Sequence, residues 1–207
     1  MVSPKNNRQR RLQIEDKLMT GLSEMLHSGI PFSDITVQQI SERTAVPRSA
    51  FYVHFADKNE LLTRIGFGAL WHSVRTAEDQ QHYPSGPDYL AAAMTAALQY
   101  IEPNRPIVRA VLDTSRYVPD VAEEFFRYQT TLQIKLAIRI RQQQQGGQAL
   151  GGDANDMAFA LAVFNTEMIR QYVSVQTSLS TVRWLELTSL VWRRVIYGVG
   201  SDPVTGV

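Results

Sequence analysis

The stretch Ile35-Thr-Val-Gln-Gln-Ile-Ser-Glu-Arg-Thr-Ala-Val-Pro-Arg-Ser-Ala-Phe-Tyr-Val-His-Phe55 decides the fold of the N-terminal part of the chain. Thr36 stands where a helix N-cap would, and the apolar residues after it are spaced for a short helix that ends near Thr44. A tight turn follows, and Pro47 suits the first position of a second helix because the N–H of that position needs no partner. The stretch therefore predicts two short helices about a turn, a helix-turn-helix, with the second helix running from Pro47 to about Phe55.

The two faces of this predicted pair differ in chemistry. The apolar side chains placed to pack inward together are Val37, Ile40, Val46, Phe51 and Phe55. The other face of the second helix begins with Arg48, Ser49 and Ala50, which suit guanine, several base edges and the thymine methyl respectively. We therefore expect this helix to enter a major groove of double-stranded DNA. The side chains placed to donate to phosphates and fix the register are Tyr52, Thr36 and Lys58.

The chain before this stretch predicts one helix and a basic arm. From Arg10 to His27 the apolar residues follow one helical face, and Ser28-Gly-Ile-Pro31 ends the helix because proline cannot continue it. The basic arm at the start of the chain holds four basic residues and no acidic residue before Glu15: Lys5, Arg8, Arg10 and Arg11. Such an arm can lie on phosphates or reach into a minor groove, and it can equally be a solvated tail.

Downstream, the pattern predicts further helices and no strand. Asp57 can cap a long fourth helix, with Glu60 as its capping-box partner. We expect an all-α protein of about nine helices, with a three-helix DNA-binding domain over residues 1–64 and a second helical domain over residues 65–207. The later helices are expected at about 88–101, 105–114, 119–144, 154–177 and 181–197.

Composition removes several classes of function. The 207 residues are 44% hydrophobic and 20% charged, as in a globular protein, and no apolar run is long enough to span a bilayer. The first residues lack the apolar stretch of a secretory signal, so we expect a cytoplasmic protein with no membrane partner. No cysteine and only four histidines are present. Disulfides and thiol chemistry are therefore excluded, and we expect neither a metal nor a cofactor.

An enzyme and a protein-binding adaptor are the two rival classes. The sequence contains no GxSxG elbow, no phosphate-binding loop and no HExxH motif. His72, Glu78, Asp79 and His82 share no single helical face, which favours solvated residues over metal ligands. We therefore expect no catalytic site. The adaptor would be distinguished by its failure to shift DNA on a gel in a salt-dependent manner.

The expected helices at 154–177 and 181–197 are apolar around most of their circumference. Such helices need cover on more than one side, either from a partner subunit or from burial within one large monomer. A partner subunit is the simpler cover in a domain this small, so we predict a homodimer with a four-helix interface. Two recognition helices related by a two-fold axis are then about 34–36 Å apart, or a multiple of it, and the operator is an inverted repeat.

The run from Thr36 to Leu61 resembles the helix-turn-helix signature of the tetracycline-repressor (TetR) family, above all in Phe-Tyr-Val-His-Phe55 followed by Lys58 and Glu-Leu61. The resemblance implies a transcriptional repressor that binds a palindromic operator as a homodimer. The family usually has glycine at Ala45 and a hydroxyl N-cap at Pro47, so the chain departs from the pattern at both. The residues implied are Thr36, Tyr52, His54 and Lys58 for phosphates, and Arg48, Ser49 and Ala50 for bases, with Gln38 as a further candidate.

Two C-terminal pieces, Phe-Asn-Thr-Glu-Met168 and Val-Trp-Arg-Arg-Val-Ile-Tyr-Gly198, are similar to the C-terminal half of the mycobacterial ethionamide-resistance repressors of the same family. The likeness implies an apolar tunnel that binds a small hydrophobic effector, with an amide presented by Asn165. From the residues alone, this amide finds its partner either in a ligand carbonyl or across the dimer or in backbone. We expect the effector to release the operator by tilting the fourth helix. The tunnel residues implied by the likeness are Leu90, Met94, Ile101, Phe164, Asn165 and Trp192.

Overall fold

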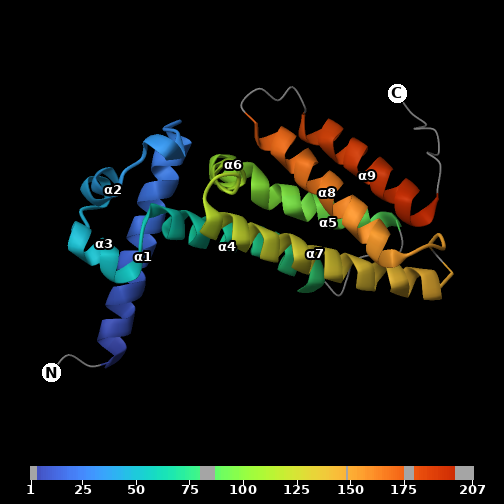
Figure 1. Cartoon of the computed structure of the whole chain (residues 1–207), viewed down its shortest axis with the longest axis horizontal. Helices are drawn as coiled ribbons and strands as arrows, with labels where there is room; N and C mark the ends of the chain where they lie inside the picture. The colour runs from blue at the N-terminus through green and yellow to red at the C-terminus, as the bar shows by residue number, and fades with distance from the viewer. Residues whose placement is uncertain (1–3, 80–86, 148, 175–179, 199–207) are drawn as a thin grey trace. The chain divides into compact units, whose positions relative to one another are not determined.

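The computed structural model describes residues 4–79, 87–147, 149–174 and 180–198, with the backbone alone for residues 4–8, 69–79 and 87–93. Regular structure in the described residues is helical throughout, without a strand, which confirms the all-α class (Figure 1). None of the helices examined over this part of the chain is both long enough and apolar enough to cross a membrane.

The helices agree closely with those expected from the sequence, with two differences. The helix expected at 154–177 ends at Val173, because Ser174 takes an extended backbone conformation that cannot continue it. The other difference lies at the start of α1. α1 begins at Pro4 and not at Arg10, because no residue between them breaks a helix and proline is tolerated in a first turn. The part of the basic arm that the structure describes is therefore helical. The α-helices are α1 Pro4–His27, α2 Val37–Thr44, α3 Arg48–His54, α4 Lys58–Asp79, α5 Pro87–Ile101, α6 Arg105–Thr114, α7 Pro119–Gln145, α8 Ala154–Val173 and α9 Thr181–Tyr197, and the short 3-10 helices are η1 Phe32–Asp34 and η2 Glu102–Asn104.

The predicted caps are present at α2 and α4. Thr36 accepts a hydrogen bond from the Gln39 backbone N–H at 3.2 Å, and the Gln39 side chain accepts one from the Thr36 N–H at 2.7 Å, which is a capping box. Asp57 Oδ1 accepts from the Glu60 N–H at 2.8 Å. Glu60 reaches back to the N–H of Ala56 at 2.7 Å, one residue further than a capping box requires. Local side chains therefore fix where both helices start.

The chain divides into two compact units that do not follow the predicted division at residue 64. The first unit holds residues 1–70 and 104–125, and the second holds 71–103 and 126–207. Close helix packing explains why residues 104–125 belong with the N-terminal segment. A Cβ atom on Gly66 of α4 would lie only 2.1 Å from Val111 Cγ2 of α6. The Val111 side chain therefore packs directly against the backbone of α4, which only glycine allows at this position.

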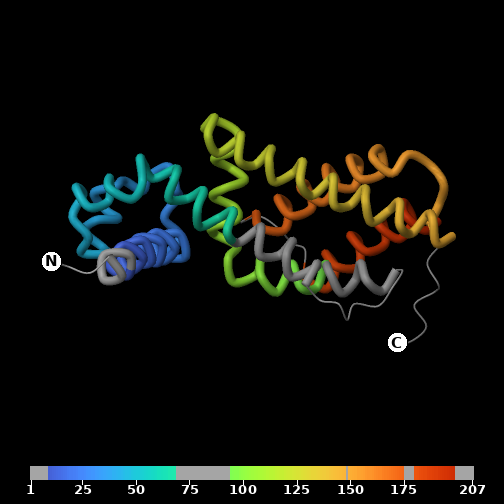
Figure 2. Tube along the Cα trace, turned by 90° about the horizontal axis from the view of Figure 1, so that it is seen from below, coloured from blue at the N-terminus to red at the C-terminus, as the bar shows by residue number. Residues whose placement is uncertain are grey.

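In the first unit, α1, α2 and α3 pack against one another (Figure 2). Their buried apolar side chains form one core. Four of the five residues predicted to pack inward are buried, and Val37 is half-buried. α1 and α2 approach closely at Gly21, where a Cβ atom would lie 2.2 Å from Thr44 Cγ2. The core residues with at most 1% exposure include Leu18, Leu22, Ile40, Phe51 and Phe55.

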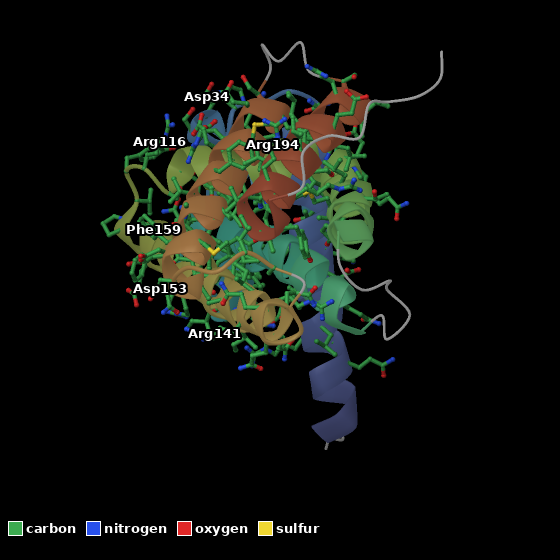
Figure 3. All side chains as sticks on the ribbon, turned by 90° about the vertical axis from the view of Figure 1, so that its right-hand side faces the viewer. Asp34, Arg116, Arg141, Asp153, Phe159 and Arg194 are labelled. Carbon is green, nitrogen blue, oxygen red and sulfur yellow. The ribbon has the colours of Figure 1, made fainter. Side chains whose placement is uncertain are left out.

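In the second unit, α8 and α9 lie side by side, and α5 packs against α9 (Figures 1 and 2). Trp184 of α9 is 1% exposed, and its indole N–H donates to the Met168 carbonyl of α8 at 2.8 Å. Arg141 and Asp153 lie at the same end of this unit, where Arg141 bonds Asn155 of α8 and Asp153 caps that helix (Figure 3). Specific polar contacts thus fix the register of these apolar helices.

Candidate DNA-binding site

α3 presents one exposed face above the buried core. Arg48 and Ser49 are exposed at its first turn, and Ala50 is half-buried beside them. The ring of Tyr52 is 50% exposed one turn further along. The structure therefore brings the three predicted base-contacting residues together at the N-terminal end of α3, with Tyr52 beside them.

Val53 lies on the same helix and was not predicted. It is 76% exposed, the most exposed of the large apolar residues in the described chain. An apolar side chain held in water on a helix that otherwise presents polar groups suits contact with a thymine methyl. The helical pattern could have identified it. Phe51 and His54 are the buried residues of α3, and Val53 lies on the opposite, exposed side of the helix.

The turn before α3 is strained at Ala45. This residue has φ 54° and ψ 28°, the left-handed conformation that favours glycine. A non-glycine residue there costs on the order of 1 kcal/mol. Pro47 follows as the N-cap of α3 with φ −57° and ψ 144°, and its ring supplies no cap side chain. The two sequence departures thus occur together in the turn that sets the direction of α3.

The exposed start of α2 carries two of the four remaining predicted contacts. Thr36 is exposed, but its hydroxyl is engaged with Gln39 in the capping box. The amide of Gln38 donates to Glu42 at 2.9 Å on the solvent side of the helix. Both side chains face water, and the N-terminal N–H groups of α2 beside them are the kind of donors that bind phosphate.

Lys58 is held by the protein itself. Its ammonium group donates to three backbone carbonyls, of Phe32 at 2.9 Å, Ser33 at 3.1 Å and Ile35 at 2.6 Å. It also lies 4.7 Å from the centre of the Phe32 ring. An ammonium group has three N–H donors, so these bonds use all of them. Burial lowers the pKa of Lys58 from its ordinary value, against the opposing charges of Asp34 and Asp57.

We expect Lys58→Met to destabilise the first unit by about 1–3 kcal/mol, because the partly buried carbonyls of Phe32 and Ile35 lose the ammonium donor. The methionine keeps most of the aliphatic stem, so the loss reports the three hydrogen bonds. Lys17→Met on the exposed side of α1 is the matched control and should leave the urea unfolding midpoint unchanged. Equal midpoints for the two variants would show that the carbonyl contacts contribute nothing.

His54 is also turned inward. Its side chain is 5% exposed, and Nδ1 lies 3.2 Å from Glu15 Oε1 of α1. A ring in this position is poorly placed to reach a phosphate on the DNA surface. The structure thus separates the predicted DNA-contacting residues into an exposed group on α2 and α3 and two internal residues, Lys58 and His54.

The predicted effector residues lie in the second unit, on α5, α8 and α9. Met94 and Ile101 of α5 are buried, and Trp192 of α9 is 8% exposed. Phe164 and Asn165 of α8 are half-buried, and the side chain of Leu90 lies outside the described residues. The Trp192 indole N–H is buried without a hydrogen-bond partner among the described residues. Within that same part of the chain no three His, Asp or Glu side chains gather as a metal site would require.

Comparison with known proteins identifies the N-terminal segment. Residues 23–65, which contain the end of α1, α2, α3 and the start of α4, match the family of bacterial regulatory proteins known as the tetR family. No curated protein matches the chain as a relative. The matched segment contains every predicted DNA-contacting residue, from Thr36 to Lys58.

Solved structures resemble the whole chain in fold. A TetR-family transcriptional regulator, PfmR, from Thermus thermophilus is 18% identical, covers 98% of this chain and 100% of its own, and has a TM-score of 0.65. The lauroyl-CoA complex of FadR, a TetR-family repressor of the same organism, is 14% identical with coverages of 93% and 100% and a TM-score of 0.66. A regulator from Saccharomonospora viridis in complex with choline is 13% identical, with coverages of 89% and 97% and a TM-score of 0.72. At these identities the likeness concerns the fold.

Proposed function

We propose, from the premise that residues 23–65 are a tetR-family helix-turn-helix segment, that this protein is a transcriptional repressor that binds an operator in double-stranded DNA. The observation that carries the proposal is the exposed first turn of α3, with Arg48 and Ser49 in water above the buried rings of Phe51 and Phe55. A regulator of this kind acts in the cytoplasm, where its operator lies, and performs no catalysis.

In this proposal the exposed residues divide by role. Arg48, Ser49 and Ala50 read base edges, and Val53 joins them against a thymine methyl. Tyr52, Thr36 and Gln38 contact phosphates and fix the register. Lys58 and His54 act inside the protein, because their polar groups bind Phe32, Ser33, Ile35 and Glu15.

The test of the function begins with an operator that wild-type protein selects from a random-sequence duplex library. We expect Arg48→Ala to weaken binding to that operator by about 1–3 kcal/mol and to relax the base preference at one position of each half-site. Arg48→Lys should also lose the preference, since lysine keeps the charge but lacks the two-pronged donor that pairs with guanine. Fluorescence anisotropy with the operator and with scrambled duplexes measures both effects.

Tyr52→Phe is the control for a phosphate contact. It removes one hydroxyl from the same helix and should weaken all sequences alike while leaving the preference intact. Wild-type protein that selects no sequence and shows no salt-dependent binding would reject the function and favour the adaptor. Retention of both affinity and preference in Arg48→Ala would reject the assignment of α3 as the recognition helix.

A homodimer formed through α8 and α9 is part of the proposal. Phe159 is 58% exposed and Val163 49% exposed on α8, and Leu190 is 37% exposed on α9. A second copy of the chain would cover these side chains and place two recognition helices on one operator. We expect light scattering to give about twice the 23.4 kDa chain mass at micromolar concentration. A stable species at the chain mass would reject the dimer.

We assign the second unit to an effector, a small hydrophobic molecule contacted by Met94, Ile101, Phe164, Asn165 and Trp192, with Leu90 as a further predicted contact. The family likeness supports a hydrophobic ligand. Two structural neighbours hold organic ligands, choline and lauroyl-CoA, and the lauroyl chain of the second is apolar. α4 begins at Lys58 in the first unit and continues past residue 70 into the second. Effector and operator should therefore oppose each other by a reciprocal coupling of about 1–3 kcal/mol. A compound that binds the protein by calorimetry but leaves operator affinity unchanged at saturation would contradict the switch.

A further inference from the structure

We propose that Glu15 of α1 is a positioning residue for the recognition helix α3. Through its contact with His54, Glu15 fixes the rotation of α3 about its own helix axis. The inference rests on the proposed DNA-binding function. It concerns a residue that faces the interior of the first unit and touches no DNA.

One carboxylate contacts three helices. Glu15 Oε1 accepts a hydrogen bond from Arg11 Nε of its own helix at 3.0 Å and lies 3.2 Å from His54 Nδ1 of α3. Its other oxygen lies 3.5 Å from a terminal nitrogen of Arg64 in α4. The Glu15 side chain is 14% exposed and that of His54 is 5% exposed. A carboxylate with this little water around it makes strong contacts with its donors.

The surrounding charges keep this carboxylate ionised. Burial by itself raises the pKa of Glu15, but hydrogen bonds from Arg11 and His54 and the positive charge of Arg64 hold that pKa below its ordinary value. The titratable groups that face Glu15 are therefore two arginines and one histidine, from α1, α4 and α3. The carboxylate is charged at neutral pH and acts as a fixed acceptor for His54.

Arg64 extends the network along the link between α3 and α4. A terminal nitrogen of Arg64 donates to Glu60 at 2.9 Å, and its guanidinium lies 4.5 Å from the centre of the Phe55 ring. Glu60 in turn accepts from the backbone N–H of Ala56. The C-terminal end of α3 is thus fastened to α1 through Glu15 and to α4 through Arg64.

The directional contact matters because α3 is short. Phe51 and Phe55 anchor the helix by apolar burial, which has no preferred direction and fixes depth more firmly than rotation. The hydrogen bond from His54 to Glu15 has a preferred direction. It therefore fixes the rotation that decides where Arg48 and Ser49 point, one and a half turns earlier on the same helix. A base-reading side chain needs its position held to within about 0.5 Å.

The experiment uses full-length protein, the operator selected by wild-type protein and a scrambled duplex of equal length. We expect Glu15→Met, which keeps the length of the side chain but has no oxygen to accept from His54, to weaken operator binding at least about fivefold, as for the loss of one base contact. The affinity for the scrambled duplex and the salt slope should be unchanged. The bases selected from the library should become less defined at the positions that Arg48 reads. A contribution to folding alone would lower the active fraction of the protein without altering its base preference.

Glu24→Met is the matched control. Glu24 lies on the same helix and pairs with Arg43 of α2 at 3.2 Å, but its side chain is 54% exposed. This variant should bind both duplexes as wild type does, since exposed ion pairs contribute little. Circular dichroism melts of each variant report whether the unit is folded.

A second pair of variants tests the same contact from α3. His54→Asn keeps a donor near the place of Nδ1 and should retain operator preference, whereas His54→Phe removes the donor and should lose it. Folded Glu15→Met with wild-type affinity and preference would overturn the inference while leaving the proposed function intact. If Glu15→Met does not fold, equal preferences for the two His54 variants overturn it. Absence of DNA binding by wild-type protein would overturn the proposed function and this inference together.

Discussion

Phe51→Ala is expected to destabilise the first unit by about 3–5 kcal/mol and to abolish sequence-specific DNA binding. The Phe51 ring is fully buried, packs edge-on against Tyr52 at 5.4 Å between centroids, and lies 5.7 Å from Phe55. Truncation leaves a cavity at the base of a helix of only seven residues. Domains are stable by about 5–15 kcal/mol, so this loss is a large share of the total. Urea unfolding followed by circular dichroism, with anisotropy on the operator, measures both effects.

Val53→Ala is the control for Phe51→Ala. It also truncates an apolar residue of α3, but the Val53 side chain is 76% exposed. Its unfolding midpoint should stay within about 0.5 kcal/mol of wild type. Any loss of operator affinity in Val53→Ala then reports a DNA contact and not a stability change. Equal unfolding midpoints for Phe51→Ala and wild type would contradict the core that the structure gives to this unit.

The helix-turn-helix was predictable because its signals are local. The capping box at Thr36 and the proline at position 47 fix the starts of α2 and α3 within a few residues of sequence. Ala45 was recognised as a departure from the usual glycine, and it adopts the left-handed conformation that such a position requires. Neighbouring residues alone determine these features, so an unaided sequence identifies them.

The internal roles of Lys58 and His54 were not predictable because their partners are remote in sequence. His54 binds a carboxylate 39 residues earlier, and Lys58 binds carbonyls more than 20 residues earlier. The resemblance identified both residue types at a DNA-binding motif but carried no information about which way each side chain turns. Packing of α1 and η1 beneath the motif decides that, and the pattern of the motif does not include those elements.

The place of residues 104–125 in the first compact unit was not predictable, for a related reason. Residues 104–125 join the first unit because Gly66 admits Val111 and because the Phe67 ring lies 6.4 Å from that of Phe125. An amphipathic helix shows that one face is buried but not which helix covers it. The sequence therefore predicted α6 as a helix and could not assign it to a neighbour.

In the second unit the sequence showed that α8 and α9 are apolar. It did not show which apolar side chains are buried within the unit and which remain exposed. Tyr172 and Trp184 are buried within the unit with ring centroids 5.6 Å apart, whereas Phe159 and Val163 remain exposed. Cover within the chain thus accounts for part of the pattern. The exposed remainder is what the proposed homodimer would bury, and a mutation in each set separates the two contributions.

Trp184→Ala is expected to destabilise the second unit by about 3–5 kcal/mol, because it removes a buried indole that joins α8 to α9. Trp184→Phe keeps an aromatic ring beside Tyr172 but removes the indole N–H that donates to the Met168 carbonyl, and should cost about 0.5–1.5 kcal/mol. Val182→Ala, on the same helix and 66% exposed, is the control and should stay within about 0.5 kcal/mol.

Thermal unfolding measured by near-ultraviolet circular dichroism and by calorimetry orders these three variants. If the indole stabilises the unit through both its volume and its N–H, we expect Trp184→Ala to be the least stable variant. Trp184→Phe should be intermediate and Val182→Ala the most stable. Equal melting temperatures of Trp184→Phe and wild type would show that the hydrogen bond to Met168 contributes nothing to stability and that packing alone accounts for the effect of Trp184→Ala. Because α9 also belongs to the proposed dimer interface, the melts are repeated over a hundredfold range of protein concentration. A cost that arises within one unit is unchanged across that range, whereas a cost that arises from dissociation grows on dilution.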